Sequence, residues 1–391
     1  MKETLLSVGF MPLTDAAPLI VAQEMGFAEE EGIALDLRRA PSWSSLRDML
    51  SFGQVDAAHM LSPVPIATAL GFGGAGAPLS AVSVLSVNGN VIGVSRALEE
   101  KLRAAGHDFD FADAEKAGRA LIGVAQGKLR IGVPFPFSMH AELVFYWLAA
   151  LGYAVPDGVA VRTVPPPLMA EAIAEGEIDA FCVGEPWGTK TVENNVGALL
   201  LPGNAIWNFA PEKVLAVRAD WAQTETSLTD RLIRAVWRAG RWLADPASRM
   251  LATEMLARKH YLDLAPDLLE RSLSGRLVIS ARGEDREVPG FVDFHAGAAG
   301  FPWRSQAEWI GRQLATRIGK DPDAAARLAR GVYRSDVYRR ALEETAADLP
   351  GASSKVEGSL SAPTPVSSSG GGLILQKDSF FDGRIFEPQG D

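Results

Sequence analysis

His140 has the side chain and the predicted position to bind a small anion. A strand is predicted at Leu129–Val133, and an amphipathic helix that ends before Gly152 follows it. Ser138 is the natural N-cap of this helix, so His140 falls in the first turn, near unpaired backbone N–H groups and the positive end of the helix dipole. Such a turn is a ready anion site. A single histidine can equally be structural, and both interpretations stay open at this point.

Trp43 lies on a second loop of the same kind. A strand is predicted at Ile33–Leu37, and a helical run follows at Leu46–Leu50, where Ser45 and Asp48 resemble a capping box. An exposed tryptophan is costly to leave in water. Trp43 therefore either packs under its own loop or covers a ligand.

The stretch VPPPLMAEAIAEGEIDAFCVGEPW, residues 164–187, predicts a third loop at a strand end. Its prolines deny the backbone donors, so a helix can begin only after them, and Gly176 ends that helix. Ile178–Val183 is short and apolar, as expected of a buried strand. Open parallel sheets keep their ligands at the carboxyl ends of strands. We therefore expect ligand contacts here, at Pro166, Val183, Gly184 and Glu185.

A sequence pattern that occurs twice in the chain favours two lobes of similar construction. Asp56-Ala57 and Asp179-Ala180 stand 123 positions apart, each behind a Gly-x-x turn and each followed by an apolar run and a proline. Both follow a helical run and begin a predicted strand. A cleft between two such lobes would hold a small ligand.

The composition is that of an ordinary globular protein and excludes several classes. The 391 residues suffice for two domains, and the net charge of −10 argues against a nucleic-acid surface. The single cysteine, Cys182, can form no internal disulfide and is too little for a zinc cluster. No window approaches the roughly 18 apolar residues of a membrane span. We expect neither direct nucleic-acid binding nor a membrane span.

The N-terminal segment predicts a strand at Leu5–Met11 and a helix at Ala16–Met25, with Thr14 or Asp15 as its cap. Before the strand there is no basic segment, apolar segment or cleavage site of a secretory signal. The expected location is therefore the cytoplasm.

Turns suggest how the chain is divided. Val87–Asn90 predicts a first crossing between lobes and Asn208–Val217 a second. We therefore assign residues 1–90 and 213–350 to the first lobe and 91–212 to the second. Residues 351–372 are rich in Gly, Ser and Pro and predict a flexible linker. Residues 373–391 contain seven large hydrophobic side chains and predict a tail that docks on the body.

Several segments together resemble the nitrate- and bicarbonate-binding proteins of ABC transporters. They are GFMPLTDAAPLIVAQEMGF, SWSSLRDML, DAAHMLSPVP, VNGN, the 164–187 stretch, PEKVLAVR and the terminal FFDGRIFEP. The resemblance covers nearly the whole chain, but the export signal and lipoprotein region of that family are missing. This departure is similar to the cytoplasmic nitrate/nitrite sensors of bacterial nitrate assimilation.

The resemblance implies an α/β, two-lobed periplasmic-binding-protein-like (type II) fold with an anion in the cleft. It places ligand contacts at Trp43, His140 and Lys213, and at Asn90, where the nitrate binders have a glutamine. Nitrate is a planar monoanion that needs a positive charge, N–H donors and a flat wall; Lys213 can supply the charge. The bicarbonate binders use calcium, but no carboxylates cluster beside Glu185 in the sequence, so no metal or other cofactor is expected.

Three functions are open. The sensor branch implies that the chain binds nitrate or nitrite and holds an RNA-binding, response-regulator-like antiterminator protein until the ligand arrives. A substrate-binding subunit of a nitrate, bicarbonate or sulfonate ABC transporter is the alternative. An iron-assisted enzyme of a related two-lobed fold is disfavoured, because that family carries a Cys-rich motif and this chain has one cysteine.

Overall fold

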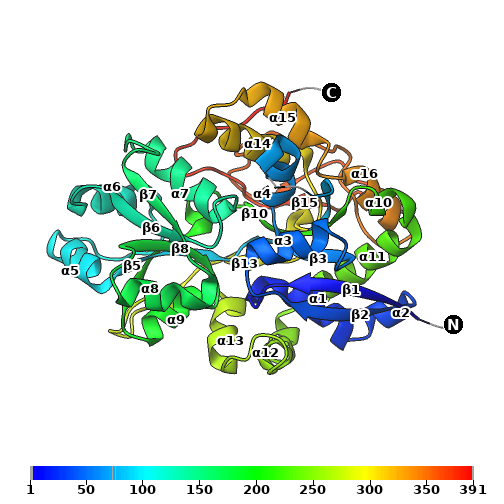
Figure 1. The fold of residues 1–391 in the computed structure, drawn as a ribbon, viewed down its shortest axis with the longest axis horizontal. Coiled ribbons are helices and arrows are strands. Elements are labelled where there is room, and N and C mark those ends of the chain that lie inside the picture. The colour runs from blue at the N-terminus through cyan, green and yellow to red at the C-terminus, as the bar shows by residue number, and fades with distance from the viewer. Residues whose placement is uncertain (1–2, 73, 75, 390–391) are drawn as a thin grey trace.

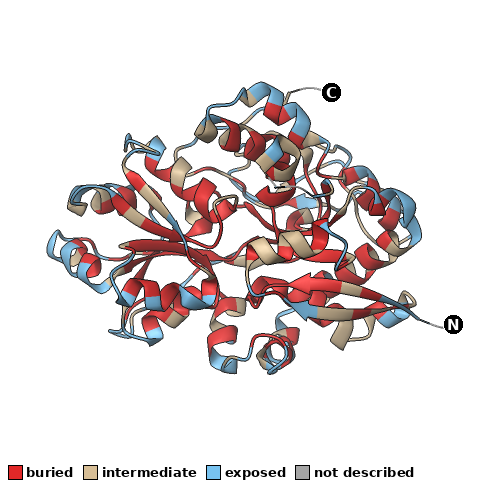
Figure 2. Ribbon diagram, in the orientation of Figure 1, coloured by how far each residue is buried: buried red, intermediate tan, exposed pale blue. Residues whose placement is uncertain are grey.

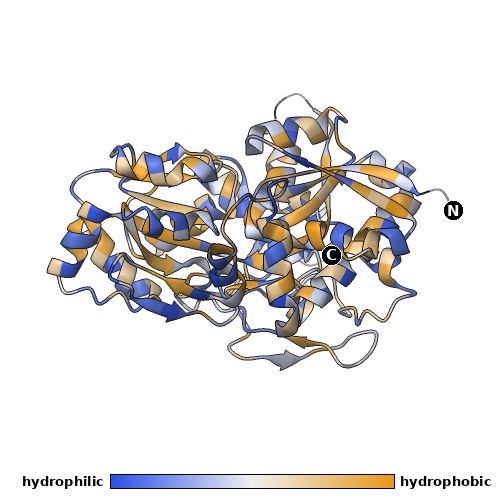
Figure 3. Ribbon diagram, turned by 90° about the horizontal axis from the view of Figure 1, so that it is seen from below, coloured by the Kyte–Doolittle hydropathy of each residue, from blue (hydrophilic) through white to orange (hydrophobic). Residues whose placement is uncertain are grey.

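The computed structural model describes residues 3–72, 74 and 76–389, and these form two α/β lobes side by side (Figure 1). One mixed β-sheet lies at the centre of each lobe, with six strands in the first and five in the second. The strands are the most deeply buried elements (Figure 2). Hydrophobic residues run along them, while hydrophilic residues concentrate on the outer faces of the helices (Figure 3).

The sheet of the first lobe takes strands from both ends of the chain. Its order is β13 (Val292–Asp293), β4 (Leu79–Asn88), β10 (Pro211–Arg218), β3 (Ala57–Leu61), β1 (Thr4–Phe10) and β2 (Ile33–Arg39). β1 is parallel to β2 and β3, and β10 runs antiparallel to β3 and β4. Successive side chains point to opposite faces, so each face of the sheet packs into a different hydrophobic cluster.

Helices cover both faces of this sheet. Against one face pack α1 (Ala17–Glu24), α11 (Thr226–Leu243), α12 (Arg249–Ala257) and α16 (Ser335–Leu342); against the other, α3 (Trp43–Ser51), α4 (Pro63–Ala67) and α14 (Arg304–Ile318). The remaining helices of this part of the chain are α2 (Phe27–Glu30), α10 (Trp221–Thr224), α13 (Pro266–Ser274) and α15 (Pro322–Arg330).

The second lobe repeats the same plan. Its sheet has the order β7 (Val159–Thr163), β6 (Leu129–Val133), β8 (Ala180–Gly184), β5 (Asn90–Ser95) and β9 (Gly197–Pro202). β6 is parallel to β7 and β8, and β5 is antiparallel to β8 and β9. Its helices are α5 (Arg96–Ala104), α6 (Ala114–Val124), α7 (Met139–Ala150), α8 (Met169–Ala174) and α9 (Trp187–Glu193).

Asp56 and Asp179, the two aspartates of the repeated sequence pattern, make equivalent contacts in the two lobes. Asp56 accepts hydrogen bonds from the backbone N–H and hydroxyl of Ser7, 49 positions earlier. Asp179 accepts from the backbone N–H of Arg130, also 49 positions earlier, and pairs with its guanidinium at 2.6 Å. Each aspartate thereby fixes where β3 or β8 joins the neighbouring parallel strand.

The lobes are joined where the chain crosses between the sheets. Asn88 ends β4 with a φ of 60° and Gly89 follows with a φ of 87°, the left-handed region that a tight turn requires. The Asn88 amide donates to the carbonyl of Asn208 at 2.8 Å and accepts from the backbone N–H of Ala210 at 3.1 Å. The first crossing is therefore hydrogen-bonded to the second.

Part of the range assigned to the first lobe lies against the second. The hairpin of β11 (Arg276–Val278) and β12 (Asp285–Glu287) follows α13. The backbone N–H of Leu199 in β9 donates to the carbonyl of Ile279 at 2.8 Å, and Arg103 in α5 pairs with Glu284. The chain therefore reaches the second lobe once more in this segment, and no sequence pattern predicted this contact.

Residues 351–372, expected as a flexible linker, are tied to the body. Glu357 is fully buried and accepts a hydrogen bond from Ser305 at 2.6 Å, and Lys355 pairs with both Glu357 and Asp378. β14 (Thr364–Pro365) pairs with β15 (Ile374–Leu375). The linker interpretation was wrong in this respect, because a few buried charged groups anchor a stretch whose composition offers little hydrophobic core.

The C-terminal tail packs against both lobes. Phe380 is 3% exposed and stacks on Trp207, with 4.8 Å between ring centroids, and on Trp309 of α14. The hydroxyl of Tyr146 in α7 donates to Asp382 at 2.9 Å. Ile385 of the same tail is 54% exposed.

Replacing Phe380 with alanine should therefore destabilise the fold. Loss of a buried phenylalanine costs about 3–5 kcal/mol, because the cavity refills only in part. Ile385→Ala is the matched control and should change the free energy of unfolding by less than about 0.5 kcal/mol. Urea denaturation measures both, and equal effects of the two variants would contradict the stacking of Phe380.

Candidate functional site

Lys213, His140, Asn90 and Trp43 converge on one buried cluster between the lobes. Lys213 lies near the start of β10 in the first lobe, and Trp43 begins α3 of the same lobe. Asn90 begins β5, and His140 lies in the first turn of α7, both in the second lobe. All four side chains are at most 1% exposed. The structure thus places together the four residues to which the resemblance pointed.

Two carboxylates hold the Lys213 ammonium. Its Nζ lies 2.7 Å from Asp15 Oδ2 and 2.9 Å from Glu212 Oε1. Burial works against the charged amine, but the charges of Asp15 and Glu212 outweigh it and raise the pKa of Lys213. Burial likewise works against a charged Asp15, yet Lys213 and His59 hold the pKa of that carboxyl well below its usual range. Asp15 and Lys213 are therefore a true ion pair.

Further polar side chains occupy the remaining carboxylate oxygens. His59 Nε2 lies 2.9 Å from Asp15 Oδ1, and His140 Nδ1 lies 3.3 Å from Glu212 Oε1. The amide nitrogen of Asn90 donates to Glu212 Oε2 at 2.7 Å. All four carboxylate oxygens of Asp15 and Glu212 thus face a donor or cation.

Burial keeps the histidines and Glu212 from carrying charge easily. It lowers the pKa of His59 and, together with Lys213, lowers the pKa of His140 well below its ordinary value. Burial raises the pKa of Glu212 despite the nearby Lys213. The site therefore holds one firm cation and one firm anion, and its overall charge depends on a proton at Glu212 or His140.

Several buried polar atoms in this cluster have no hydrogen-bond partner among the described residues. Apart from the atoms that lie within the ion-pair contacts given above, they are Nε1 of Trp43, Nε2 of His140, Oδ1 of Asn90 and the hydroxyl of Thr14. A buried polar group left unsatisfied costs about 1–3 kcal/mol. The Trp43 ring also lies close to the charge, with its centroid 5.6 Å from Lys213 Nζ. The cluster thus offers one free N–H group, on Trp43, and an unpartnered ring nitrogen of His140 beside a lysine.

Gly184 allows Leu13 and the charged cluster to approach its backbone closely. A Cβ at this position would lie 2.7 Å from Leu13 Cδ2, 3.6 Å from Asp15 Oδ2 and 3.7 Å from His140 Nε2. The predicted contact at Gly184 therefore borders the cluster directly. Val183 precedes it in β8 and pairs with Val91.

Glu185 and Pro166 lie differently from what the sequence suggested. The Glu185 carboxylate turns to α9, where it accepts from the backbone N–H of Thr189 at 3.1 Å, and burial raises its pKa to about 7. Only its backbone reaches across the cleft, where its carbonyl accepts from the Thr14 N–H at 3.0 Å. Pro166 is buried in a short turn before α8, and no recorded contact joins it to the cluster in the described part of the chain.

The two lobes are closed over the cluster. Besides the Thr14–Glu185 hydrogen bond, the indole N–H of Trp187 donates to the carbonyl of Pro12 at 2.9 Å. Both contacts join the loop after β1 to the loop after β8. Water is thereby kept from the Lys213 cluster.

Sequence reasoning missed Asp15, His59 and Glu212. Asp15 was expected to cap a helix, but that turn has Leu13 as N-cap with no side-chain hydrogen bond, and Asp15 turns to Lys213 instead. The capping box at Ser45 is likewise replaced by Ser42, which accepts from the Ser45 N–H. Two sequence features could have indicated a buried polar site. One is a histidine inside an apolar strand, and the other is a Glu-Lys pair at the start of another apolar strand.

In the described part of the chain, no three His, Cys, Asp or Glu side chains are arranged to hold a metal ion. None of the helices described is both long and apolar enough to cross a lipid bilayer.

Comparison with known proteins identifies relatives over the whole length. Residues 1–257 match the NMT1-like family. The chain is 30% identical to the nitrate/nitrite binding protein NrtA of Synechococcus elongatus over 402 residues, which cover 98% of this chain and 84% of that protein. It is 33% identical to the bicarbonate transport ATP-binding protein CmpC of the same species over 318 residues. That match covers 81% of this chain but only 45% of CmpC.

A solved structure agrees with the sequence matches. The periplasmic nitrate-binding protein NrtA from Synechocystis PCC 6803 matches with a TM-score of 0.84 and 25% identity, covering 99% of this chain and 96% of that one. The predicted periplasmic-binding-protein-like fold is thus confirmed. The NrtA relatives are binding proteins, in agreement with the expectation that this chain is not an enzyme.

Gly184→Ala should crowd the cluster beside His140. The added methyl must displace Leu13 toward the cluster or press on His140 Nε2, so a ligand held there should bind at least tenfold more weakly. Gly123→Ala in α6 is the control, because a Cβ there meets nothing within 4 Å. Calorimetric titration with nitrate compares the two variants, and unchanged affinity in Gly184→Ala would place the ligand elsewhere.

Proposed function

Because the chain belongs to the NMT1-like family, we propose that it binds nitrate or nitrite at the Lys213 cluster and signals ligand binding to a partner protein. The observation that carries the ligand is the free N–H of Trp43 and the unpartnered Nε2 of His140, which donates once it carries a proton, beside a buried lysine. They come from opposite lobes, so an anion between them would join the lobes.

The charges and donors of the cluster favour a small monoanion. Every oxygen of Asp15 and Glu212 already faces a donor or cation, whereas the Trp43 N–H is free and His140 Nε2 can donate once it is protonated. Nitrate and nitrite carry one negative charge and can accept from both groups. A dianion would add a second negative charge beside two carboxylates.

The partner proposed is an RNA-binding, response-regulator-like antiterminator protein, held in the cytoplasm until nitrate arrives. The net charge of −10 supports it, because an acidic surface suits a basic RNA-binding protein. Control of a partner requires that the partner distinguish ligand-bound from ligand-free protein. The names of the relatives support equally a second candidate, the substrate-binding subunit of an ABC transporter.

Nitrate binding should take up a proton. A bound anion favours the protonated forms of His140 and Glu212, whose other charged or titratable neighbours are Asp15, His59 and Lys213. Cys182 and Tyr333 also lie near Glu212, and burial raises the pKa of both, so they stay neutral. The pKa values of His140 and Glu212 therefore rise on binding, and affinity should fall as the pH increases, by up to tenfold per pH unit where a full proton is taken up. Calorimetry in two buffers of different ionisation enthalpy counts the protons. A dissociation constant independent of pH would contradict this linkage.

Trp43→Phe should weaken nitrate binding without disturbing the charges. It removes the free indole N–H but keeps the ring, so the loss of one hydrogen bond to an anion should cost about 10–100-fold in affinity. Trp207→Phe is a matched control, since the Trp207 N–H is also buried and unpartnered in the described structure but lies under the tail. Equal affinities of the two variants would remove Trp43 from the site.

Lys213→Met tests the same site more severely. The substitution leaves Asp15 and Glu212 buried without their cation, which costs about 3–5 kcal/mol of stability. Folding must therefore be verified by circular dichroism before nitrate binding is measured. A folded variant that still binds nitrate normally would refute the assignment.

The signalling role predicts that nitrate dissociates the partner. The full-length protein co-purified with the antiterminator should release it at millimolar nitrate, while Trp43→Phe should retain it at the same concentration. No complex, or a complex indifferent to nitrate in a protein that does bind nitrate, would refute the sensor and favour the transport subunit.

A further inference from the structure

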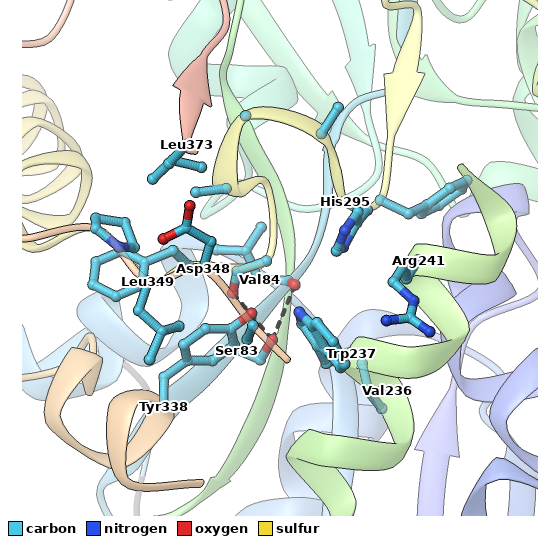
Figure 4. A pocket seen from close by; sticks show the side chains of 18 of the residues that line it. Ser83, Val84, Val236, Trp237, Arg241, His295, Tyr338, Asp348, Leu349 and Leu373 are labelled. Atoms are coloured by element: carbon cyan, nitrogen blue, oxygen red, sulfur yellow. Dashed lines mark hydrogen bonds between the residues drawn. The ribbon is translucent and has the colours of Figure 1, made fainter. Parts of the chain in front are cut away.

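A second cavity lies in the first lobe, away from the Lys213 cluster. It measures about 280 Å³, and none of the residues around Lys213 lines it. β4 and α11 form its inner walls, and residues 294–301 form another. Residues 346–350 and 372–374, from the C-terminal part of the chain, close it from outside (Figure 4).

Arg241 brings an uncommitted positive charge to this cavity. No carboxylate lies within ion-pair distance of its guanidinium among the described residues. By contrast Arg238, one turn earlier on α11, pairs with Glu30 and Glu31. The Arg241 Cζ instead lies 5.2 Å from the ring centroid of Trp237. Its fork of N–H groups is therefore available for a carboxylate.

Two more polar side chains at the cavity lack side-chain hydrogen bonds in the described structure. His295 meets Trp237 edge to face at 5.8 Å, and burial together with Arg241 lowers its pKa, so the ring is neutral. Tyr338 is 4% exposed and burial raises its pKa, so its hydroxyl keeps its proton. Arg241, Trp237 and His295 gather at one end of the cavity, while Tyr338 and Leu349 lie at the other (Figure 4).

Apart from Ser83, whose hydroxyl donates to backbone carbonyls, the other side chains of the lining are apolar except for one acidic group. Val84, Leu349 and Leu373 supply hydrophobic surface. Asp348 lies across the cavity from Arg241 (Figure 4) and accepts from the backbone N–H groups of Gly370 and Gly372 at 2.6 and 2.8 Å. These bonds favour its charged form, so Asp348 would repel a second negative charge on a ligand.

We propose that this cavity binds a small organic monocarboxylate. Arg241 and His295 hold the carboxylate, and an apolar or aromatic body lies along Trp237 toward Leu373. The site is separate from the proposed nitrate site, and either can be tested without the other. Such a ligand would sit between the first lobe and the C-terminal segment that closes the cavity.

The test uses the full-length protein and three probes of nearly the same shape. Benzoate should bind, as measured by calorimetry or ligand-detected NMR. Benzamide, which lacks the charge, should bind at least tenfold more weakly. Phthalate, with a second carboxylate, should also bind more weakly because of Asp348. Failure of benzoate to bind, or equal binding of all three probes, would overturn the proposal.

Three variants test whether benzoate binds in this cavity. Arg241→Met should reduce benzoate affinity about 10–100-fold, since one charge-assisted interaction is lost. Arg238→Met, on the same helix, should bind benzoate normally. Trp43→Phe should also bind it normally, which separates this cavity from the nitrate site. Benzoate binding that survives Arg241→Met, or is lost in Trp43→Phe, would overturn the assignment.

Discussion

The ion pair between Lys213 and Asp15 is the constraint on which the site depends. A buried ammonium is tolerated only when opposite charges and hydrogen bonds replace its lost hydration. Here Asp15 comes from the loop after β1 and Lys213 from β10, the strand that returns from the second lobe. Glu212 then extends the cluster to Asn90 and His140 of the other lobe. One network of charges thereby requires both sheets, both crossings and the loop after β1 to be in register.

The two lobes are built in the same way, and this shared construction holds the elements around the cluster in position. Asp56 and Asp179 each fix a strand against its parallel neighbour at the same sequence separation. The strands so fixed are β3, which carries His59, and β8, which ends at Gly184. Both deliver their ends to the cluster. The repeat in the sequence is therefore also a repeat in how the site is positioned.

Local patterns predicted most elements and the loops that carry the site. Ser138 caps α7 as expected, and Leu129–Val133 is a strand with the predicted bounds. Asp15, His59 and Glu212 escaped prediction because their roles depend on burial by distant segments. An aspartate before a helix has the signature of a cap, and nothing local shows that Lys213 is near. The C-terminal part was misread for the related reason that Lys355, Glu357 and Asp378 form a buried cluster only when brought together from separate turns.

The unsatisfied groups give the closed lobes a direct link to the ligand. In the closed arrangement the Trp43 N–H and His140 Nε2, a donor when protonated, face no partner in the described chain and are shielded from water, whereas opening would let water reach them. Each such group costs about 1–3 kcal/mol, and the contacts of Thr14 and Trp187 across the cleft must offset that cost for closure to persist. An anion that accepts from both donors would remove the cost in the closed form alone. A shift from mostly open to mostly closed needs about 5.5 kcal/mol of differential affinity. Two restored donors can supply about 2–6 kcal/mol of it. Attraction between the anion and Lys213, which only the closed site shields from solvent, would add to that sum.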